Sequence, residues 1–155
     1  LARGEILLFL HADTLLPPGA LERLDARATP AAKLWGGFHQ AFSGTSWDLK
    51  TISRIHNLRC RLTGVFYGDQ AMFVGAPLFR TAGGFPDVEI LEDIKLSERL
   101  LEHARPEFVP ASVVTDSRKF EKMGSVRSFF RCILILVCNE LRLPILGKRF
   151  FTPIR

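Results

Sequence analysis

Short apolar runs along the chain alternate with segments in which apolar positions recur every three or four residues. The first run, Glu5-Ile-Leu-Leu-Phe-Leu10, is typical of a strand that is covered on both faces in the middle of a parallel sheet. We predict further strands over residues 33–42, 71–74 and 108–114, and helices over 17–27, 45–62, 77–82, 125–141 and from residue 92 onward.

Two of the predicted helices carry an apolar stripe, which we expect to face the core. Because strands and helices alternate along the chain, the pattern predicts an α/β fold in which helices flank a mostly parallel sheet. The first stripe consists of Trp47, Ile55, Leu58 and Leu62, with Thr51 in the same row, and the second of Ile94, Leu96, Leu100 and Leu101.

The chain has 155 residues, 47% of them hydrophobic and 24% charged, which is the composition of one globular domain with a core. This excludes a disordered chain, a collagen-like repeat and a disulfide scaffold. The three cysteines show no CxxC spacing, which disfavours a metal knuckle and fits a reducing cytoplasm. The longest apolar stretch, residues 132–138, is too short for a bilayer, which requires about 20 residues.

The net charge of +5 is unevenly distributed. Residues 1–117 contain 12 lysines and arginines against 14 carboxylates, whereas residues 118–155 contain nine against two. We therefore expect a near-neutral body and a basic helical tail that packs on the body or on an anionic membrane surface. Residues 126–147 fit either an interfacial helix or an ordinary packing helix with solvated arginines. No signature of a nucleic-acid-binding fold accompanies the charge, so nucleic acid is not an expected partner.

A ligand site is expected after the first strand, because ligands of open α/β sheets bind beyond the carboxyl ends of the strands. His11 and Asp13 lie there, and together they can hold a divalent cation that also contacts a diphosphate. The alternative is that Asp13 or Thr14 caps the following turn and that His11 only packs.

Glu92 and Asp93, at the start of a predicted helix, form a second candidate site. One carboxylate can act as a general base toward a hydroxyl nucleophile while the other supports it. Alternatively, both only stabilise the helix N-terminus electrostatically. A third candidate, Tyr67-Gly68-Asp69-Gln70, is either a ligand-binding loop or a turn. The chain contains no GxSxG elbow, Walker loop or GxGxxG, so those functions have no support.

The order of four segments is informative: ILLFLHADTLLPPGAL, YGDQAMFV, GGFPDVEILEDIKLSERL and VVTDSRKFEKMGSVRS. In this order they resemble the family 2 glycosyltransferases of the GT-A fold, and most of all a bacterial subgroup described as radical-SAM or selenodomain-associated glycosyltransferases. The resemblance implies a partial GT-A sheet. It also implies transfer of a sugar from a nucleotide-sugar donor to a hydroxyl acceptor, assisted by a divalent metal, Mg²⁺ or Mn²⁺.

The resemblance also assigns expected roles to residues. Asp13 corresponds to the metal-binding carboxylate, and His11 stands where the family has its first aspartate. Glu92 and Asp93 correspond to the catalytic pair, and Asp93 is the expected base. In inverting transfer the deprotonated hydroxyl attacks the anomeric carbon in line, while the metal offsets charge on the departing diphosphate. Asp69 and Gln70 are expected to line the sugar or acceptor side, and Arg118, Lys119 and Arg127 to contact diphosphate or a phosphorylated acceptor.

Members of the family begin with a βαβα half that binds the nucleotide, and this chain begins at or just before the strand that follows it. We therefore expect the acceptor-side portion of a transferase, with little turnover by itself, in which the strand over 6–10 lacks a neighbour and can pair with another copy. The alternative function is a non-catalytic binding or assembly module. The expected location is the cytoplasm, peripheral to the inner face of the membrane.

Overall fold

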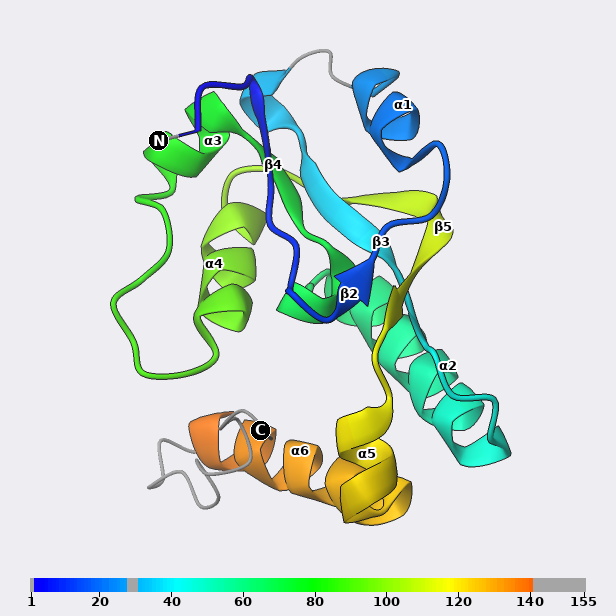
Figure 1. Cartoon of the computed structure of the whole chain (residues 1–155). Coiled ribbons are helices and arrows are strands. Elements are labelled where there is room, and N and C mark those ends of the chain that lie inside the picture. The colour runs from blue at the N-terminus through cyan, green and yellow to red at the C-terminus, as the bar shows by residue number, and fades with distance from the viewer. Residues whose placement is uncertain (1, 28–30, 141–155) are drawn as a thin grey trace.

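The computed structural model describes residues 2–27 and 31–140. Within them, helices pack on a five-stranded mixed sheet of order β1-β4-β3-β5-β2 (Figure 1). The strands are β1 (Ile6–Leu8), β2 (Thr14–Leu15), β3 (Trp35–Phe42), β4 (Phe73–Gly75) and β5 (Glu107–Thr115). The helices are α1 (Ala20–Asp25), α2 (Trp47–Thr63), α3 (Ala76–Thr81), α4 (Glu92–Leu101), α5 (Arg118–Met123) and α6 (Ser125–Glu140), with 3₁₀ turns η1 (Ala31–Lys33) and η2 (Gly68–Gln70).

The α/β class is confirmed, but the expectation of a mostly parallel sheet is wrong. Only the β3–β5 pair is parallel, whereas β1–β4, β3–β4 and β2–β5 are antiparallel. The reversal occurs at the η2 turn, where Gln70 Nε2 donates a hydrogen bond to the carbonyl of Phe38. Strand β4 then runs antiparallel to β3 and pairs with its first residues, Trp35 and Gly36. Alternation of strands and helices in a sequence does not determine this direction.

Strand β1 lies at an edge of the sheet, so its predicted central position is also wrong. The N–H of Phe9 donates to Met72 O and that of Ala76 to Glu5 O, so alternate residues of β1 face β4. The N–H and C=O groups of Ile6 and Leu8 point to the other side, which no described strand occupies. The expectation that this strand lacks a neighbour is thus confirmed for the described residues.

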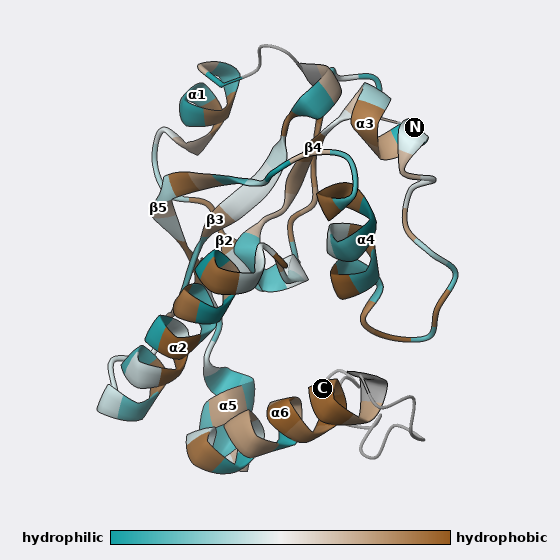
Figure 2. Cartoon of the chain, turned by 180° about the vertical axis from the view of Figure 1, so that it is seen from behind, coloured by the Kyte–Doolittle hydropathy of each residue, from teal (hydrophilic) through white to brown (hydrophobic). Residues whose placement is uncertain are grey.

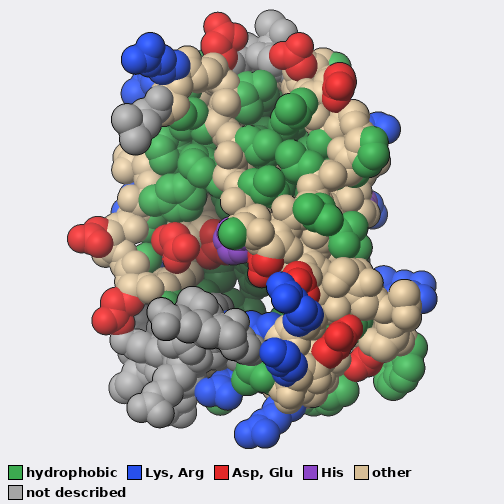
Figure 3. Space-filling model, in the orientation of Figure 1, with side chains coloured by type: hydrophobic (Ala, Val, Ile, Leu, Met, Phe, Trp, Pro, Cys, Tyr) green, Lys and Arg blue, Asp and Glu red, His purple; other side chains and the backbone are tan. Residues whose placement is uncertain are grey.

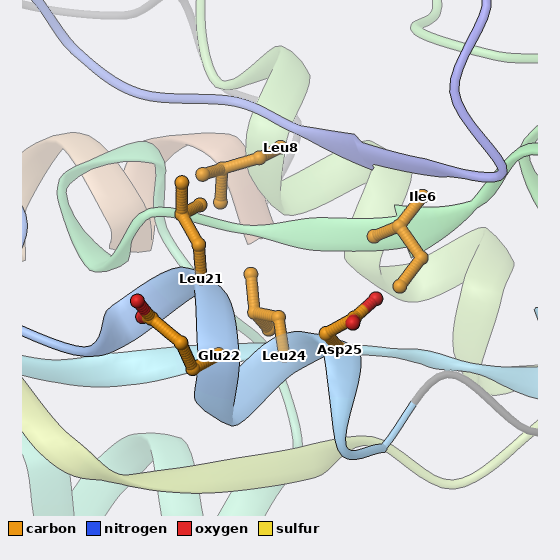
Figure 4. Close-up of a pocket in the computed structure, with 6 residues that line it drawn as sticks. All are labelled: Ile6, Leu8, Leu21, Glu22, Leu24 and Asp25. Carbon is orange, nitrogen blue, oxygen red and sulfur yellow. The ribbon is translucent and has the colours of Figure 1, made fainter.

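The apolar character of β1 has a different cause from the one predicted. Leu7 and Phe9 pack against one hydrophobic cluster and Ile6 and Leu8 against another, so both faces are apolar although one edge is open. Between β1 and α1 lies an open groove lined by Ile6, Leu8, Leu21 and Leu24, with Glu22 and Asp25 at its rim (Figure 4). Hydrophobic side chains gather widely on this face of the molecule (Figure 3).

Two hydrophobic clusters lie on opposite faces of the sheet, because successive residues of a strand point in opposite directions. Val74 belongs to the cluster with Trp35, Phe66, Leu96 and Leu100, beside α3 and α4. Its neighbour Phe73 belongs to the cluster with Phe38, Val109, Val113 and Leu24, beside α1. The clusters fix the sheet between the helices, and the site described below lies beside them.

The apolar stripe of α2 faces solvent, which contradicts the sequence-based expectation. Trp47 and Leu62 are 76% and 78% exposed, and Ile55 and Leu58 are exposed as well. The buried residues of α2 are Leu49, Ser53 and Cys60. Asn57 holds this helix against β3: its side-chain amide donates to the carbonyl of Gln40 and accepts from the N–H of Gln40, both at 2.9 Å. Asn57 thus satisfies a β3 backbone segment that β4 does not reach, and the stripe must face outward.

Helices α5 and α6 form the described part of the basic tail, and residues 141–155 lie outside the described residues. The ring of Phe120 in α5 contacts Phe42 of β3, with centroids 4.7 Å apart, so the tail packs on the body. In the part of the chain that the structure describes, no helix combines the length and apolarity that crossing a membrane requires.

Candidate functional site

The three candidate sites from the sequence converge on one cavity of about 390 Å³. It lies where the segment after β1, the η2 turn, the start of α4, and helices α5 and α6 meet. Its polar lining includes His11, Asp13, Tyr67, Gly68, Asp69, Glu89, Glu92, Asp93, Thr115, Asp116 and Lys119. Residues from His11 to Leu136, which are 125 positions apart in the sequence, therefore contribute to a single site.

Gly68 connects two of the three candidates. Its N–H donates to Asp93 Oδ2 at 2.6 Å, which ties the η2 turn to the start of α4. A Cβ on Gly68 would collide with the imidazole ring of His11, so the ring lies directly against the backbone of residue 68. Glycine is therefore required here by the close approach of a side chain from the first candidate site.

The carboxylate of Asp93 is held at the cavity wall by two backbone donors. Besides the bond from Gly68, the N–H of Ile94 donates to Oδ1 at 2.8 Å. Burial raises the pKa of Asp93, the two backbone donors act in the opposite direction, and the charges of Glu92 and Asp69 add to the rise. A carboxylate that is fixed in orientation and made more basic has the properties of a general base.

Two residues with left-handed backbone conformation flank this arrangement. Leu91, just before Glu92, has φ 63°, and Ala71, just after η2, has φ 47°. Residues other than glycine rarely adopt such angles, which cost of order 1–3 kcal/mol and are concentrated at functional sites. Glu92 itself is exposed, whereas Asp93 is half-buried, so the two adjacent carboxylates differ in environment as expected.

Asp13 and Lys119 also line the cavity. The carbonyl of Asp13 accepts the N–H of Asp116, and Thr14 Oγ1 lies 3.2 Å from Thr115 Oγ1, so this segment is fixed to the end of β5. Burial lowers the pKa of Lys119, and the nearby Cys132 and Asp13 act in the opposite direction. The Asp13 carboxylate therefore lies within electrostatic range of the ammonium group.

Beneath the η2 turn lies a polar cluster that the sequence did not reveal. The guanidinium of Arg59 lies 3.7 Å from the ring centroid of Tyr67, and His56 Nε2 lies 3.6 Å from Asp69 Oδ1. Burial lowers the pKa of His56, so at neutral pH the imidazole is uncharged and the contact with Asp69 is not an ion pair. No sequence signal marks these α2 residues, because their helix was expected to bury its other side.

Helix α6 provides an apolar wall that was likewise not predicted. Cys132, Ile135 and Leu136 line the cavity opposite the carboxylates, together with Phe42 and Phe120. Burial raises the pKa of the Cys132 thiol to about 11, so it stays protonated at neutral pH and does not act as a nucleophile. The basic tail thus completes the site rather than forming a separate unit.

Three of the predicted binding residues do not line the cavity. Gln70 is fully buried, accepts from the N–H of Tyr67 through Oε1 and donates to Phe38, so it holds the turn in place. Arg118 is exposed and pairs with Asp116 at 2.6 Å, and Arg127 is exposed on α6. Asp69 and Lys119 do line it, as do His11, Asp13 and both carboxylates of the second candidate site.

Side chains that can bind a metal line the cavity, among them His11, Asp13, Asp69 and Asp93. Within residues 2–27 and 31–140, no group of three or more histidine, cysteine or carboxylate side chains is arranged to hold a metal ion.

The chain matches no protein-family model, no curated protein and no solved structure. Any functional conclusion therefore depends on the chemistry of the cavity itself.

Proposed function

We propose that the cavity is the acceptor-side catalytic site of a glycosyltransferase, in which a sugar moves from a nucleotide-sugar donor to a hydroxyl acceptor. The observation that carries this proposal is the Asp93 carboxylate, which is buried, fixed by two backbone donors and placed in one cavity with Asp13 and Lys119. The resemblance of four sequence segments to family 2 glycosyltransferases supports the same reaction.

Asp93 acts as the general base. Its raised pKa increases its affinity for the acceptor proton. The acceptor O–H bond breaks as the proton passes to Asp93, and the oxygen forms a bond to the anomeric carbon. The bond from that carbon to the donor diphosphate breaks, and the nucleoside diphosphate leaves with the electron pair.

Lys119 opposes the negative charge that develops on the leaving diphosphate. Its ammonium group lies in the cavity near Asp13, and a fixed cation placed where charge develops stabilises the transition state. His11 shields one side of Gly68, which keeps the N–H of that residue directed at Asp93. The protein side chains thus supply a base on one wall and a cation on another.

The test compares binding and turnover in matched variants of the purified chain. UDP- and GDP-sugars are added with and without Mn²⁺, and thermal stability and nucleoside diphosphate release are both measured. We expect one donor to raise the melting temperature, because a ligand at 100 times its Kd stabilises the folded protein by about 2.7 kcal/mol. Asp13→Ala is expected to remove this shift. Asp93→Asn is expected to retain this shift, while its rate of nucleoside diphosphate release, already slow in the parent chain, falls about 100-fold or more.

Asp87→Asn is the control, because Asp87 is an exposed aspartate in the loop before α4 and lies outside the cavity lining. Release that persists at the normal rate in Asp93→Asn would contradict the assigned base. The second candidate function is a non-catalytic binding module. A donor-dependent shift without any nucleoside diphosphate release would identify that function instead.

A further inference from the structure

The outward sides of α2 and α6 are apolar, although neither belongs to the cavity. On α2 the exposed residues follow one another at intervals of three, four or eight, which places them on a single side of the helix. On α6 the exposed apolar residues also share one side, and the opposite side lines the cavity through Cys132 and Ile135. We call the two sides the outward surface, which consists of Trp47, Ile55, Leu58, Leu62, Val126, Phe130, Ile133, Leu134 and Val137.

The two helices lie next to each other and run in the same general direction. Ser125, at the start of α6, donates a hydrogen bond to Asp48 in the first turn of α2. Near their other ends, Arg59 and Thr63 of α2 and Leu136 and Val137 of α6 line one shallow cleft. Both views of the molecule show the pair along one end, with the sheet on its other side (Figures 1 and 2). The outward surface is therefore made by neighbouring elements.

Basic residues border the outward surface. Lys50, Arg54 and Arg61 are exposed along one flank of the α2 stripe, and Arg127 is exposed beside the α6 stripe. Asp48 is the only carboxylate in α2, and it is bonded to serine hydroxyls. Two copies that met through this surface would bring these cations together, whereas an anionic surface would neutralise them.

We propose that the outward surface docks the protein on an anionic lipid bilayer. Each stripe is a convex helix side with large apolar residues, and a flank of lysine and arginine fits this geometry because their heads remain at the phosphate level. Trp47 lies at the end of its stripe, and tryptophan is favoured at the boundary between headgroups and acyl chains. The proposal concerns the location of the protein and stands independently of the reaction in the cavity.

The two tryptophans make the proposal testable by fluorescence. Trp35 is fully buried and its Nε1 donates to the carbonyl of Ala104, so its emission is insensitive to the surroundings of the protein. Trp47 is exposed, so docking transfers it from water to an apolar phase. We expect a blue shift on addition of vesicles of phosphatidylcholine containing phosphatidylglycerol. Vesicles of phosphatidylcholine alone and high salt should abolish it.

Co-sedimentation of the full chain with the same vesicles provides the second measurement. Leu62→Glu is expected to weaken partitioning at least about tenfold by placing a charge in the apolar stripe. Arg54→Ala is expected to weaken it about fivefold, the contribution of one cation near an anionic surface. The matched control is Leu15→Glu, because Leu15 is exposed to a similar degree but lies on β2, away from the outward surface.

Sedimentation velocity over a range of protein concentrations distinguishes the remaining occupants. Self-association that Leu62→Glu abolishes, without vesicle binding, would overturn the proposal and assign the surface to a second copy. The proposal would also be overturned if the monomer failed to bind anionic vesicles, or if Leu62→Glu bound them as strongly as the parent chain. Trp47→Phe should remain bound while losing the blue shift, which confirms that Trp47 is the reporter.

Discussion

Helices α2 and α4 each carry four apolar residues that were predicted to face the core, yet α4 buries most of them and α2 exposes all of them. In α4, Ile94, Leu96 and Leu100 are buried, the two leucines in the cluster that contains Trp35, and only Leu101 departs from the predicted side. In α2, all four apolar residues of the stripe face solvent. The stripe pattern is therefore insufficient to orient a helix.

The difference lies in the surroundings of each helix. Each helix binds the backbone of one residue through a polar side chain: Ser97 of α4 bonds both the N–H and the carbonyl of Phe66, and Asn57 of α2 does the same with Gln40. Ser97 is surrounded by the hydrophobic cluster that contains Phe66, and the neighbouring Leu96 and Leu100 are buried in that cluster. Asn57 instead bonds a segment of β3 that pairs with β5 but that β4 does not reach, and the apolar stripe lies on the other side of α2.

The largest expected effect follows from exchanging leucine for alanine in both helices. Leu96→Ala should lower the free energy of unfolding by about 2–5 kcal/mol, because Leu96 is fully buried and the change leaves a cavity. Leu58→Ala should change it by less than about 0.5 kcal/mol, because Leu58 is 57% exposed. Urea denaturation measures both. Similar losses in the two variants would show that the α2 stripe is covered in the folded protein.

A smaller effect is expected from the two anchoring side chains. Asn57→Ala and Ser97→Ala each leave one backbone N–H and one carbonyl without a partner, which costs about 1–3 kcal/mol. Thr51→Ala is the control, because the Thr51 hydroxyl bonds only the carbonyl of Trp47 on the exposed side of α2. If Asn57→Ala unfolded at the same urea concentration as Thr51→Ala, Asn57 would not be what orients α2.

The smallest effect is a pH dependence with opposite sign in the two helices. Burial lowers the pKa of His56 in α2, so its contribution to stability is present above the ordinary histidine pKa and is lost as the pH falls. Burial raises the pKa of Asp93 in α4, so its contribution is present below the ordinary aspartate pKa and is lost as the pH rises through the raised value. His56→Gln should reduce the loss of stability on acidification.

Asp93→Asn should have the reverse effect, removing the component of stability that decreases with rising pH. Melting temperatures measured across the acidic range compare each variant with the parent chain. Parallel curves for the parent and His56→Gln would mean that His56 titrates with an ordinary pKa, which is incompatible with its burial.

Local features of the fold were predictable, whereas long-range ones were not. The segments of β3, α4 and β5 were located from apolar spacing, because that spacing reports burial within a few residues. The direction of β4 and the edge position of β1 depend on the hydrogen bond between Gln70 and Phe38 and on the sheet order, which join residues far apart in the sequence. No local pattern encodes such contacts.

In the candidate site, too, the residues with local sequence signals were predictable and those positioned by long-range packing were not. Asp13 and Asp93 were found because carboxylates after a strand and at a helix start are recognisable, and both line the cavity. Gln70 was expected to bind ligand. A polar side chain in a turn can equally form hydrogen bonds with backbone groups, and the buried Gln70 does this with the N–H of Tyr67. The contributions of α6 and of the cluster around His56 required knowledge of which helix sides face inward.

The contact between Gly68 and His11 restricts the order in which substitutions can accumulate in this chain. Any side chain at position 68 meets the imidazole, and the same residue presents its N–H to Asp93. A side chain at position 68 therefore requires the imidazole of His11 to move or residue 11 to become smaller, while the bond to α4 has to be preserved. Substitutions in these three segments are thus coupled, although the segments are far apart in the sequence.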